Sequence, residues 1–253
     1  MTKLSLPQVT LFTTCPPELF ELTINSVRTC QFLTNFAETI ISAEKSGIER
    51  PEAERIDGLT LIEITPVGKA NEAGKWFFRE LPGIIKTSHI LNIEWDSWIT
   101  NPDLWCQEWL EYDYIGARWP WRPEGQNIGN GGFSLISKRL METVKRLRLL
   151  EESQGLDTEI GTVWRQQLES EGIKYPPTAI ADRFSYERTV PDGPTFGFHG
   201  MFNWWREMPD HVLCELDFPR YVTRKIEYAE LMGTYAQMRK WKCVEALQRQ
   251  LIK

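Results

Sequence analysis

Two carboxylates that stand one residue apart are the first feature of this sequence that could do chemistry. Glu94 and Asp96 flank Trp95 directly after a short apolar run. In an extended backbone, side chains two positions apart point the same way, so both carboxylates can address one hard cation. A magnesium or manganese ion held there would neutralise a departing diphosphate. The alternative is a strand end with two solvated carboxylates, since charged residues are mostly exposed.

A histidine far along the chain could complete such a site. His199 stands in the segment Phe196-Gly197-Phe198-His199-Gly200, where aromatic and glycine neighbours would hold a neutral imidazole in a fixed loop. A third metal ligand from a distant segment would have this setting, and so would a hydrogen-bonded core histidine. His89 and His211 have no comparable setting, and we expect them to be structural or surface residues.

Asp157 is the remaining candidate for proton transfer. It precedes a helix that the sequence predicts over about 158–171, so its simplest role is an N-cap for the free amides of that helix. A carboxylate in this place could also take a proton from an attacking hydroxyl. Glu159 is a poorer candidate, because negative charge in the first turn of a helix needs no functional explanation.

Basic and aromatic residues could hold a phosphorylated or ring-shaped ligand. Lys75, Arg118 and Arg122 could pair with phosphates, although each could equally be a surface charge. Residues 118–125 include Trp119 and Trp121, whose indoles could stack on a sugar or a base; ordinary loop packing would explain them as well.

Alternating strands and helices in the first half of the chain would position these residues. Apolar runs predict strands at 9–14, 39–42, 59–64 and 89–93. Helical spacing predicts helices over about 16–27, 76–85, 138–150 and 158–171, and residues 44–57 indicate a loop. This order is typical of a mostly parallel sheet covered by helices, which binds ligands beyond the carboxyl ends of its strands. Glu94 follows one of those ends.

The overall composition limits the classes of protein that remain. With 253 residues, of which 42% are hydrophobic, the chain can bury one large core. A net charge of -6 disfavours nucleic acid as a partner. The 5 cysteines have no C-x-x-C spacing, so they indicate neither a disulfide framework nor a zinc site. No run of about 18 apolar residues occurs, and we expect a cytoplasmic protein without a transmembrane segment.

The order of these motifs resembles a bacterial and phage family of glycosyltransferase-like proteins that is known only as a domain of unknown function. The similarity covers about residues 70–205. It is carried by Thr87-Ser88-His89-Ile90-Leu91, Trp95-Asp96, Asn101-Pro102, Tyr112-Asp113-Tyr114-Ile115-Gly116, Gly129-Asn130-Gly131-Gly132-Phe133-Ser134-Leu135, Asp157 and Phe196-Gly197-Phe198-His199-Gly200.

The resemblance implies a nucleotide-diphospho-sugar transferase fold of the GT-A-like kind, an α/β protein with three α/β/α layers and a mostly parallel central sheet. We expect residues 1–220 to form this domain and 221–253 a helical extension packed on it. The implied activity is metal-dependent transfer of a sugar from a nucleotide-diphosphate sugar to a hydroxyl acceptor, with Mn²⁺ or Mg²⁺. The acceptor would be a glycan or, as an alternative that the acidic charge disfavours, a hydroxymethylated base of phage DNA. A non-catalytic carbohydrate- or nucleotide-binding module is the third possibility.

Roles for individual residues follow from the same resemblance. Glu94, Asp96 and His199 would hold the metal, and Asp157 would be the base. Donor and acceptor would lie against Thr13, Thr14, Lys75, Trp95, Asn130, Gly131, Gly132 and Phe133, of which Thr13 and Thr14 are placed by analogy of fold alone. The chain departs from the family pattern twice. Glu94 stands where glutamine is expected, which adds a possible ligand, and Leu156 stands where glutamate is often found, which leaves Asp157 as the one acid there.

Overall fold

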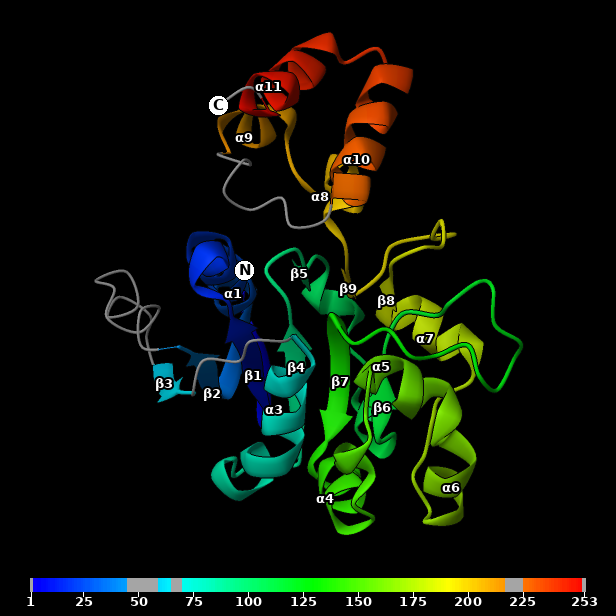
Figure 1. The fold of residues 1–253 in the computed structure, drawn as a ribbon. Coiled ribbons are helices and arrows are strands. Elements are labelled where there is room, and N and C mark those ends of the chain that lie inside the picture. The colour runs from blue at the N-terminus through cyan, green and yellow to red at the C-terminus, as the bar shows by residue number, and fades with distance from the viewer. Residues whose placement is uncertain (1, 45–58, 65–69, 217–224, 252–253) are drawn as a thin grey trace.

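The computed structural model describes residues 2–44, 59–64, 70–216 and 225–251. At its centre lies a six-stranded sheet in the order β3-β2-β1-β4-β7-β6 (Figure 1). These strands are β1 (Leu4–Cys15), β2 (Thr34–Ala43), β3 (Leu59–Glu63), β4 (His89–Ile93), β6 (Tyr114–Ile115) and β7 (Phe133–Ser137). The first four of that order run parallel, and β7 runs antiparallel to both β4 and β6. The prediction of a mostly parallel sheet is confirmed.

Apolar side chains on both faces of the sheet explain why helices cover both. Leu11, Leu91 and Leu135 pack with helix α1 (Phe20–Leu33) on one face. Their neighbours along the strands, such as Phe12 and Ile90, pack on the other face with α3 (Ala70–Ile84) and α4 (Lys138–Arg146). Because successive side chains of a strand alternate between faces, these continuous apolar runs bury both sides. The three predicted layers follow.

Most predicted elements are present with shifted ends. Strand 89–93 has the predicted bounds, whereas β1 and β2 are longer than predicted. Pro82 lies within the last turn of α3. The prediction of a loop at 44–57 lies almost wholly outside the described residues. Helix α4 ends before the predicted residue 150, because Arg148 takes a left-handed conformation with φ of 59°.

The helix predicted over 158–171 is present but is not a single regular helix. The chain forms α5 (Leu156–Thr158), a π-helical turn η6 (Glu159–Val163) and α6 (Arg165–Ser170). Gly161 of the wide turn lies so close to Ile128 and Gly129 that a side chain there would collide with their backbone. Such π-helical turns are frequent at functional sites, and this one directly follows Asp157.

A second, small sheet brings distant segments together. Its order is β5-β9-β8, with β5 (Trp98–Ile99), β8 (Ser185–Tyr186) and β9 (Gly197–Phe198). In its register Trp98 pairs with Phe198. This pairing places the segment after β9 beside the segment that joins β4 to β5, so it determines which late residues can reach the strand end at Glu94.

Helices form the C-terminal region, which Figure 1 shows beyond one end of the central sheet. They are α8 (Trp204–Glu207), α9 (Asp210–Glu215), α10 (Lys225–Gln237) and α11 (Trp241–Leu251). Leu231 and Leu247 share one buried cluster with Leu22 of α1 and Trp95, so the helices pack on the body of the protein. The predicted boundary at 220 falls outside the described residues and stays a prediction.

The remaining short elements are η1 (Pro17–Leu19), η3 (Pro102–Leu104), η4 (Gln107–Glu111), η5 (Leu149–Glu151), α7 (Thr178–Phe184) and η7 (Met201–Asn203). Among the helices that the structure describes, none combines the length and apolar character needed to cross a bilayer.

Candidate metal centre and active site

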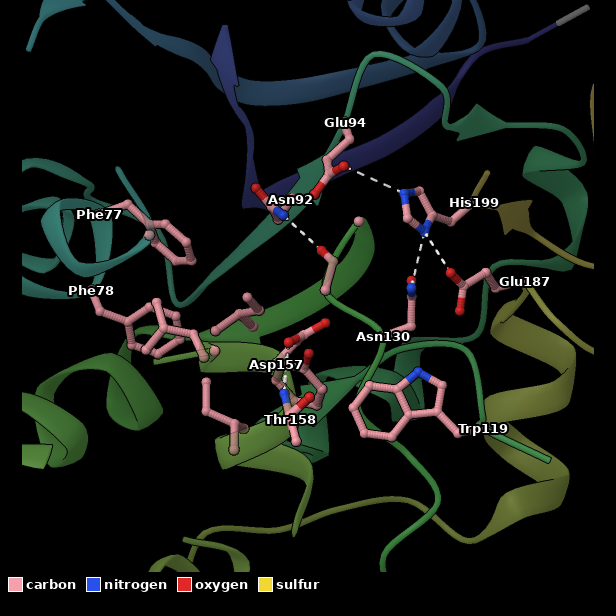
Figure 2. A pocket seen from close by; sticks show the side chains of 18 of the residues that line it. Phe77, Phe78, Asn92, Glu94, Trp119, Asn130, Asp157, Thr158, Glu187 and His199 are labelled. Atoms are coloured by element: carbon pink, nitrogen blue, oxygen red, sulfur yellow. Dashed lines mark hydrogen bonds and ion pairs between the residues drawn. The ribbon is translucent and has the colours of Figure 1, made fainter. Parts of the chain in front are cut away.

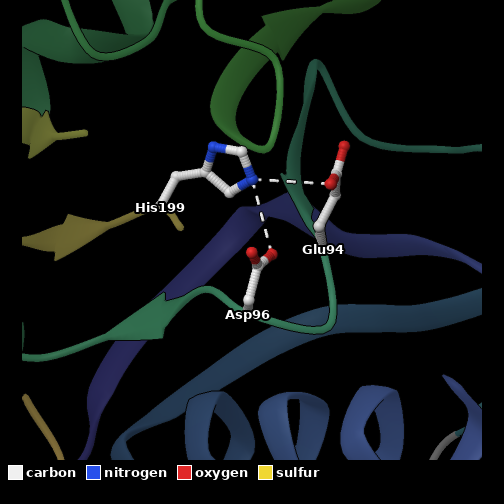
Figure 3. Close-up of side chains that lie close together, drawn as sticks. All are labelled: Glu94, Asp96 and His199. Atoms are coloured by element: carbon white, nitrogen blue, oxygen red, sulfur yellow. Dashed lines mark ion pairs between the residues drawn. The ribbon is translucent and has the colours of Figure 1, made fainter. Parts of the chain in front are cut away.

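The three predicted metal ligands converge at the carboxyl end of β4 (Figure 3). His199 Nε2 lies 3.4 Å from Glu94 Oε2 and 3.4 Å from Asp96 Oδ1. One ligand atom from each of the three residues can be chosen so that all lie within 4.8 Å of one another. The strand end supplies the two acids, and the pairing of β5 with β9 supplies the histidine.

Backbone hydrogen bonds hold the two acids in place. The Glu94 amide donates to Gly132 O at 2.9 Å and to Ser97 Oγ at 2.9 Å, which closes a tight turn after β4. Asp96 Oδ2 accepts a hydrogen bond from the Met201 amide at 3.0 Å. One oxygen of Asp96 is therefore tied to the backbone, and the other faces His199.

The free polar atoms of this cluster fit a divalent cation. The Asp96 side chain is 1% exposed, yet neither its Oδ1 nor His199 Nε2 makes a hydrogen bond within the described part of the chain. Buried polar atoms are nearly always paired, so these two facing atoms call for a proton between them or for a bound cation. Two carboxylates and an imidazole are ligands that manganese and magnesium accept. Glu94, 41% exposed, leaves the centre open on one side.

The same carboxylates control the protonation of His199. Burial by itself lowers the pKa of this imidazole, but Asp96, Glu187 and Glu94 outweigh burial and raise the pKa well above 6.5. A positive charge is therefore favoured at this point, as a proton on the ring or as a metal ion beside it.

The far side of the imidazole meets Asn130 and Glu187. His199 Nδ1 lies 2.9 Å from Asn130 Nδ2 and 3.5 Å from Glu187 Oε1, while Asn130 Oδ1 is buried and has no hydrogen bond to the residues that the structure describes. Amide oxygen and nitrogen have nearly the same shape, and turning the Asn130 amide over lets Oδ1 accept a hydrogen bond from a protonated Nδ1. The lone pair on Nε2 is then free to bind a metal.

A cavity of about 490 Å³ lies against this cluster (Figure 2). Among the described residues, three carboxylates line it, those of Glu94, Asp157 and Glu187, together with one guanidinium, that of Arg122. His199 also lines it, and its other lining residues are apolar or uncharged: Gly74, Phe77, Phe78, Asn92, Tyr114, Trp119, Trp121, Asn130, Gly131, Gly132, Ile136, Gln154, Gly155, Leu156, Thr158 and Ile160. The predicted ligand-binding residues Asn130, Gly131 and Gly132 are thus in its wall.

Asp157 faces this cavity from α5, close to Gly131. Its Oδ1 accepts a hydrogen bond from the Thr158 amide at 2.7 Å. Burial raises the pKa of Asp157 above 3.8, the Glu94 and Glu187 charges add to the rise, and the Thr158 amide and His199 oppose it. A carboxyl with a raised pKa in a cleft is suited to exchange a proton.

The N-cap interpretation of Asp157 is wrong. Asp157 lies within the first turn of α5, whose N-cap position is taken by Gly155. Glu159 has the structural role instead: its carboxylate accepts hydrogen bonds from Ser153 Oγ and from the Gln154 amide. Glu159 thereby fixes the loop that leads into α5.

A protein family described as DUF5672, of unknown function, matches residues 72–199. The chain belongs to this family. The match contains both acids of the metal cluster, Asp157 and His199, and it confirms the resemblance to a family of unknown function that the order of motifs indicates. A comparison with curated protein sequences gives no significant match.

Solved structures similar to this DUF5672 chain include glycosyltransferases. The galactosyltransferase LgtC, solved with donor and acceptor sugar analogues, is 13% identical over 75% of this chain and 86% of LgtC, with a TM-score of 0.49. A glycosyltransferase involved in glycosylation of the major capsid of PBCV-1 is 12% identical over 76% and 91% of the two chains, with a TM-score of 0.49. A Mycobacterium tuberculosis protein solved with manganese gives 12% identity over 69% and 86%, with a TM-score of 0.40. Activity has to be argued from the site itself.

Several residues predicted to bind donor or acceptor lie outside the cavity wall of the DUF5672 chain: Thr13, Thr14, Lys75, Trp95 and Phe133. Thr14 Oγ1 hydrogen-bonds Ser42 Oγ at 2.9 Å, and Thr13 is buried within β1. Lys75 Nζ pairs with Glu72 at 3.2 Å. These contacts give Thr13, Thr14 and Lys75 structural roles. The ligand-binding roles of all five residues stay predictions.

The two aromatic residues of that set are packed in the interior. The Trp95 ring meets Trp204 edge to face at 5.6 Å. Phe133 is fully buried and packs on Phe184 at 5.3 Å between centroids. Each of them supports a neighbouring cavity residue through the backbone, since Trp95 separates the two metal-site acids and Phe133 follows Gly132.

Sequence reasoning missed some of the residues that shape the site. Glu187 follows β8, a two-residue strand too short to produce a pattern. Phe77 and Phe78 carry the ordinary signal of a buried helix face. His89, in contrast, fits its structural interpretation: Nδ1 lies 2.9 Å from Ser88 Oγ and Nε2 3.1 Å from Tyr112 O, and burial lowers the pKa of His89.

Proposed function

We propose that this chain is a metal-dependent glycosyltransferase that moves a sugar from a nucleotide-diphosphate sugar to a hydroxyl acceptor. The observation that supports the proposal most is the pair of buried atoms Asp96 Oδ1 and His199 Nε2, 3.4 Å apart and without hydrogen bonds in the described part of the chain. His199 lines a cavity that is also lined by a carboxyl with a raised pKa, that of Asp157.

Glu94, Asp96 and His199 are the residues that would hold the cation. Bound there, a divalent cation supplies positive charge that stabilises a departing diphosphate. Asn130 and Glu187 orient the imidazole from its other side. The main requirement of this reaction is electrostatic, because negative charge develops on the departing diphosphate.

Asp157 is the residue proposed to take the proton. The acceptor hydroxyl forms the new bond to the sugar carbon, the bond from that carbon to the diphosphate oxygen breaks, and the hydroxyl proton passes to the Asp157 carboxylate. Its Oδ1 is engaged by the Thr158 amide, so Oδ2 is the oxygen available for this proton. General bases in such positions contribute about 10²–10⁴ in rate.

The size and walls of the cavity support a sugar-sized ligand. Its volume of about 490 Å³ lies in the range of small-molecule sites, roughly 300–1,000 Å³. Phe77, Phe78 and Trp119 give it apolar walls. Such walls limit the access of water, which would otherwise compete with the acceptor for the donor.

The experiment that tests the proposal is an assay of released nucleoside diphosphate with a panel of nucleotide sugars, with manganese and with a chelator. We expect release from one donor, dependent on metal and lowered by Asp157→Asn. Tight donor binding without release would support a non-catalytic module instead. Transfer confined to duplex DNA that carries hydroxymethylated bases would support the DNA-modifying alternative.

A further inference from the structure

Beside the cavity stands a loop that holds an indole in solvent. Trp121 is 60% exposed, whereas its neighbour Trp119 is 6% exposed, and both line the cavity. The two rings are stacked, with centroids 6.2 Å apart and an interplanar angle of 18°. The outer ring therefore presents one free face, and the inner ring fixes its orientation.

The loop is built to hold this position. Arg118 and Ile128 form an antiparallel bridge at its base, and the Trp119 amide donates to Asn127 O at 2.6 Å. Arg118 Nε also pairs with Asp182 Oδ1 of α7 at 2.6 Å. Pro120 and Pro123 restrict the backbone on either side of Trp121. An exposed indole held by this many constraints indicates a binding surface rather than loop packing alone.

The position of the loop indicates that it lies at the end of the cavity where the acceptor would bind. Figure 2 shows Trp119 beyond Asn130, on the side of the cavity away from Glu94. The metal cluster that would take the donor diphosphate is therefore at one end, and the stacked indoles are at the other. Asp157 lines the same cavity, where it can meet a hydroxyl carried by a ligand on Trp121.

The charge of the cavity indicates which acceptor fits. Among its described lining residues, three carboxylates outnumber the two groups that can carry positive charge, Arg122 and His199. Without a bound cation, such a surface does not attract a polyanion, whereas nucleic-acid sites are strongly basic. An uncharged sugar ring suits it, since the ring has an apolar C–H face for the indole and hydroxyls for Asp157, Gln154 and Asn130.

We propose that Trp121 is the stacking platform for an uncharged carbohydrate acceptor. The proposal rests on the proposed function, because it divides one cavity between a donor end and an acceptor end. It also decides between the two acceptor classes, in favour of a neutral glycan over DNA.

The test is ¹⁹F NMR of the full chain labelled with 5-fluorotryptophan, without metal or donor, titrated with α- and β-linked glucans, lactose and chitotriose. The Trp121 resonance is assigned from the spectrum of Trp121→Phe. We expect at least one of these neutral oligosaccharides to shift it. Trp121→Ala should weaken that binding about fivefold or more, and Trp121→Phe, which keeps a flat apolar face, should weaken it less.

Trp241→Ala is the matched control, since Trp241 is 58% exposed on α11 and does not line the cavity. It should leave the binding unchanged. The proposal is overturned if none of the oligosaccharides shifts the Trp121 resonance, or if only duplex DNA with hydroxymethylated bases does. Because donor and metal are absent, either result is distinct from a failure of metal-dependent donor binding, which is measured separately.

Discussion

Asp96 Oδ1 and His199 Nε2 face each other at 3.4 Å in the interior, and neither has a hydrogen bond in the described part of the chain. A carboxylate oxygen and an imidazole nitrogen can share a proton or a metal ion at this separation. The carboxylates around His199 raise its pKa, so without metal the ring holds the proton. Metal binding is therefore expected to compete with that proton and to release it.

Gly132→Ala should weaken metal binding by about tenfold or more, which is the effect expected when the support of a metal ligand is lost. A Cβ at this position would collide with the His199 ring, around Nε2. The ring would have to leave the position that faces Asp96. Titration calorimetry with manganese measures the change.

Gly131→Ala is the control for that variant. The Cβ added there would lie 3.3 Å from Asp157 Cβ and would not reach the imidazole. Metal affinity should stay close to that of the wild type. Equal losses in the two variants would mean that the loop as a whole, rather than contact with His199, determines metal affinity.

The variants Asn130→Asp and Asn130→Leu should differ in their affinity for metal. The aspartate keeps an acceptor beside His199 Nδ1, and the leucine removes it. We expect leucine to weaken manganese binding by about 10–100-fold and aspartate by much less. ¹⁵N NMR of His199 in the presence of a diamagnetic metal, magnesium, should show the proton on Nδ1 in the wild type. A proton on Nε2 in the metal-bound state would contradict this orientation.

Asp157→Asn should lower kcat by about 10²–10⁴ and remove an acidic limb from the pH profile of kcat. That limb reflects an Asp157 pKa raised above 3.8 by burial and by Glu94 and Glu187. In the wild type, activity falls as the pH falls through this raised pKa, because the base becomes protonated. A variant with unchanged kcat would exclude Asp157 as the base.

The same substitution should increase stability near neutral pH. A carboxyl whose pKa is raised on folding destabilises the folded state once it ionises, so the wild type loses stability as the pH rises from 3.8 through the raised value. Asparagine cannot ionise and avoids that loss. Urea unfolding of both proteins on each side of this interval measures the difference, which should vanish at the acidic end.

The parts of the site that local patterns encode could be predicted from the sequence. The apolar run of β4 and the acids after it indicate a strand end with a paired carboxylate site, and that is where Glu94 and Asp96 lie. The unusual neighbours of His199 predict a ligand there, although its approach to Asp96 depends on the pairing of β5 with β9. Strands of two residues produce no periodic pattern in a sequence, so the contact of His199 with Asp96 could not be predicted.

Other parts depend on tertiary contacts that have no local signature. The π-helical turn after Asp157 replaces a predicted regular helix because Gly161 packs against the backbone near Gly129. The sequence suggests Lys75 as a phosphate ligand, yet its ammonium group forms an ion pair with Glu72 one turn away. Glu187 lies beside His199 because of the tertiary fold, and no local sequence pattern indicates this contact.

The most direct test of the central claim is a thermal-shift measurement of nucleotide sugars, each with and without manganese, on the wild type and Asp96→Asn. Asparagine keeps an oxygen for the Met201 amide, so the turn should survive while the metal loses its buried charged ligand. Asp103→Asn, on the short helix η3, is the control. A ligand that binds the native state raises Tm with the logarithm of its excess over Kd. The account predicts manganese-dependent stabilisation by a nucleotide sugar in the wild type and the control, lost in Asp96→Asn; stabilisation that persists in Asp96→Asn, or none in the wild type, would contradict it.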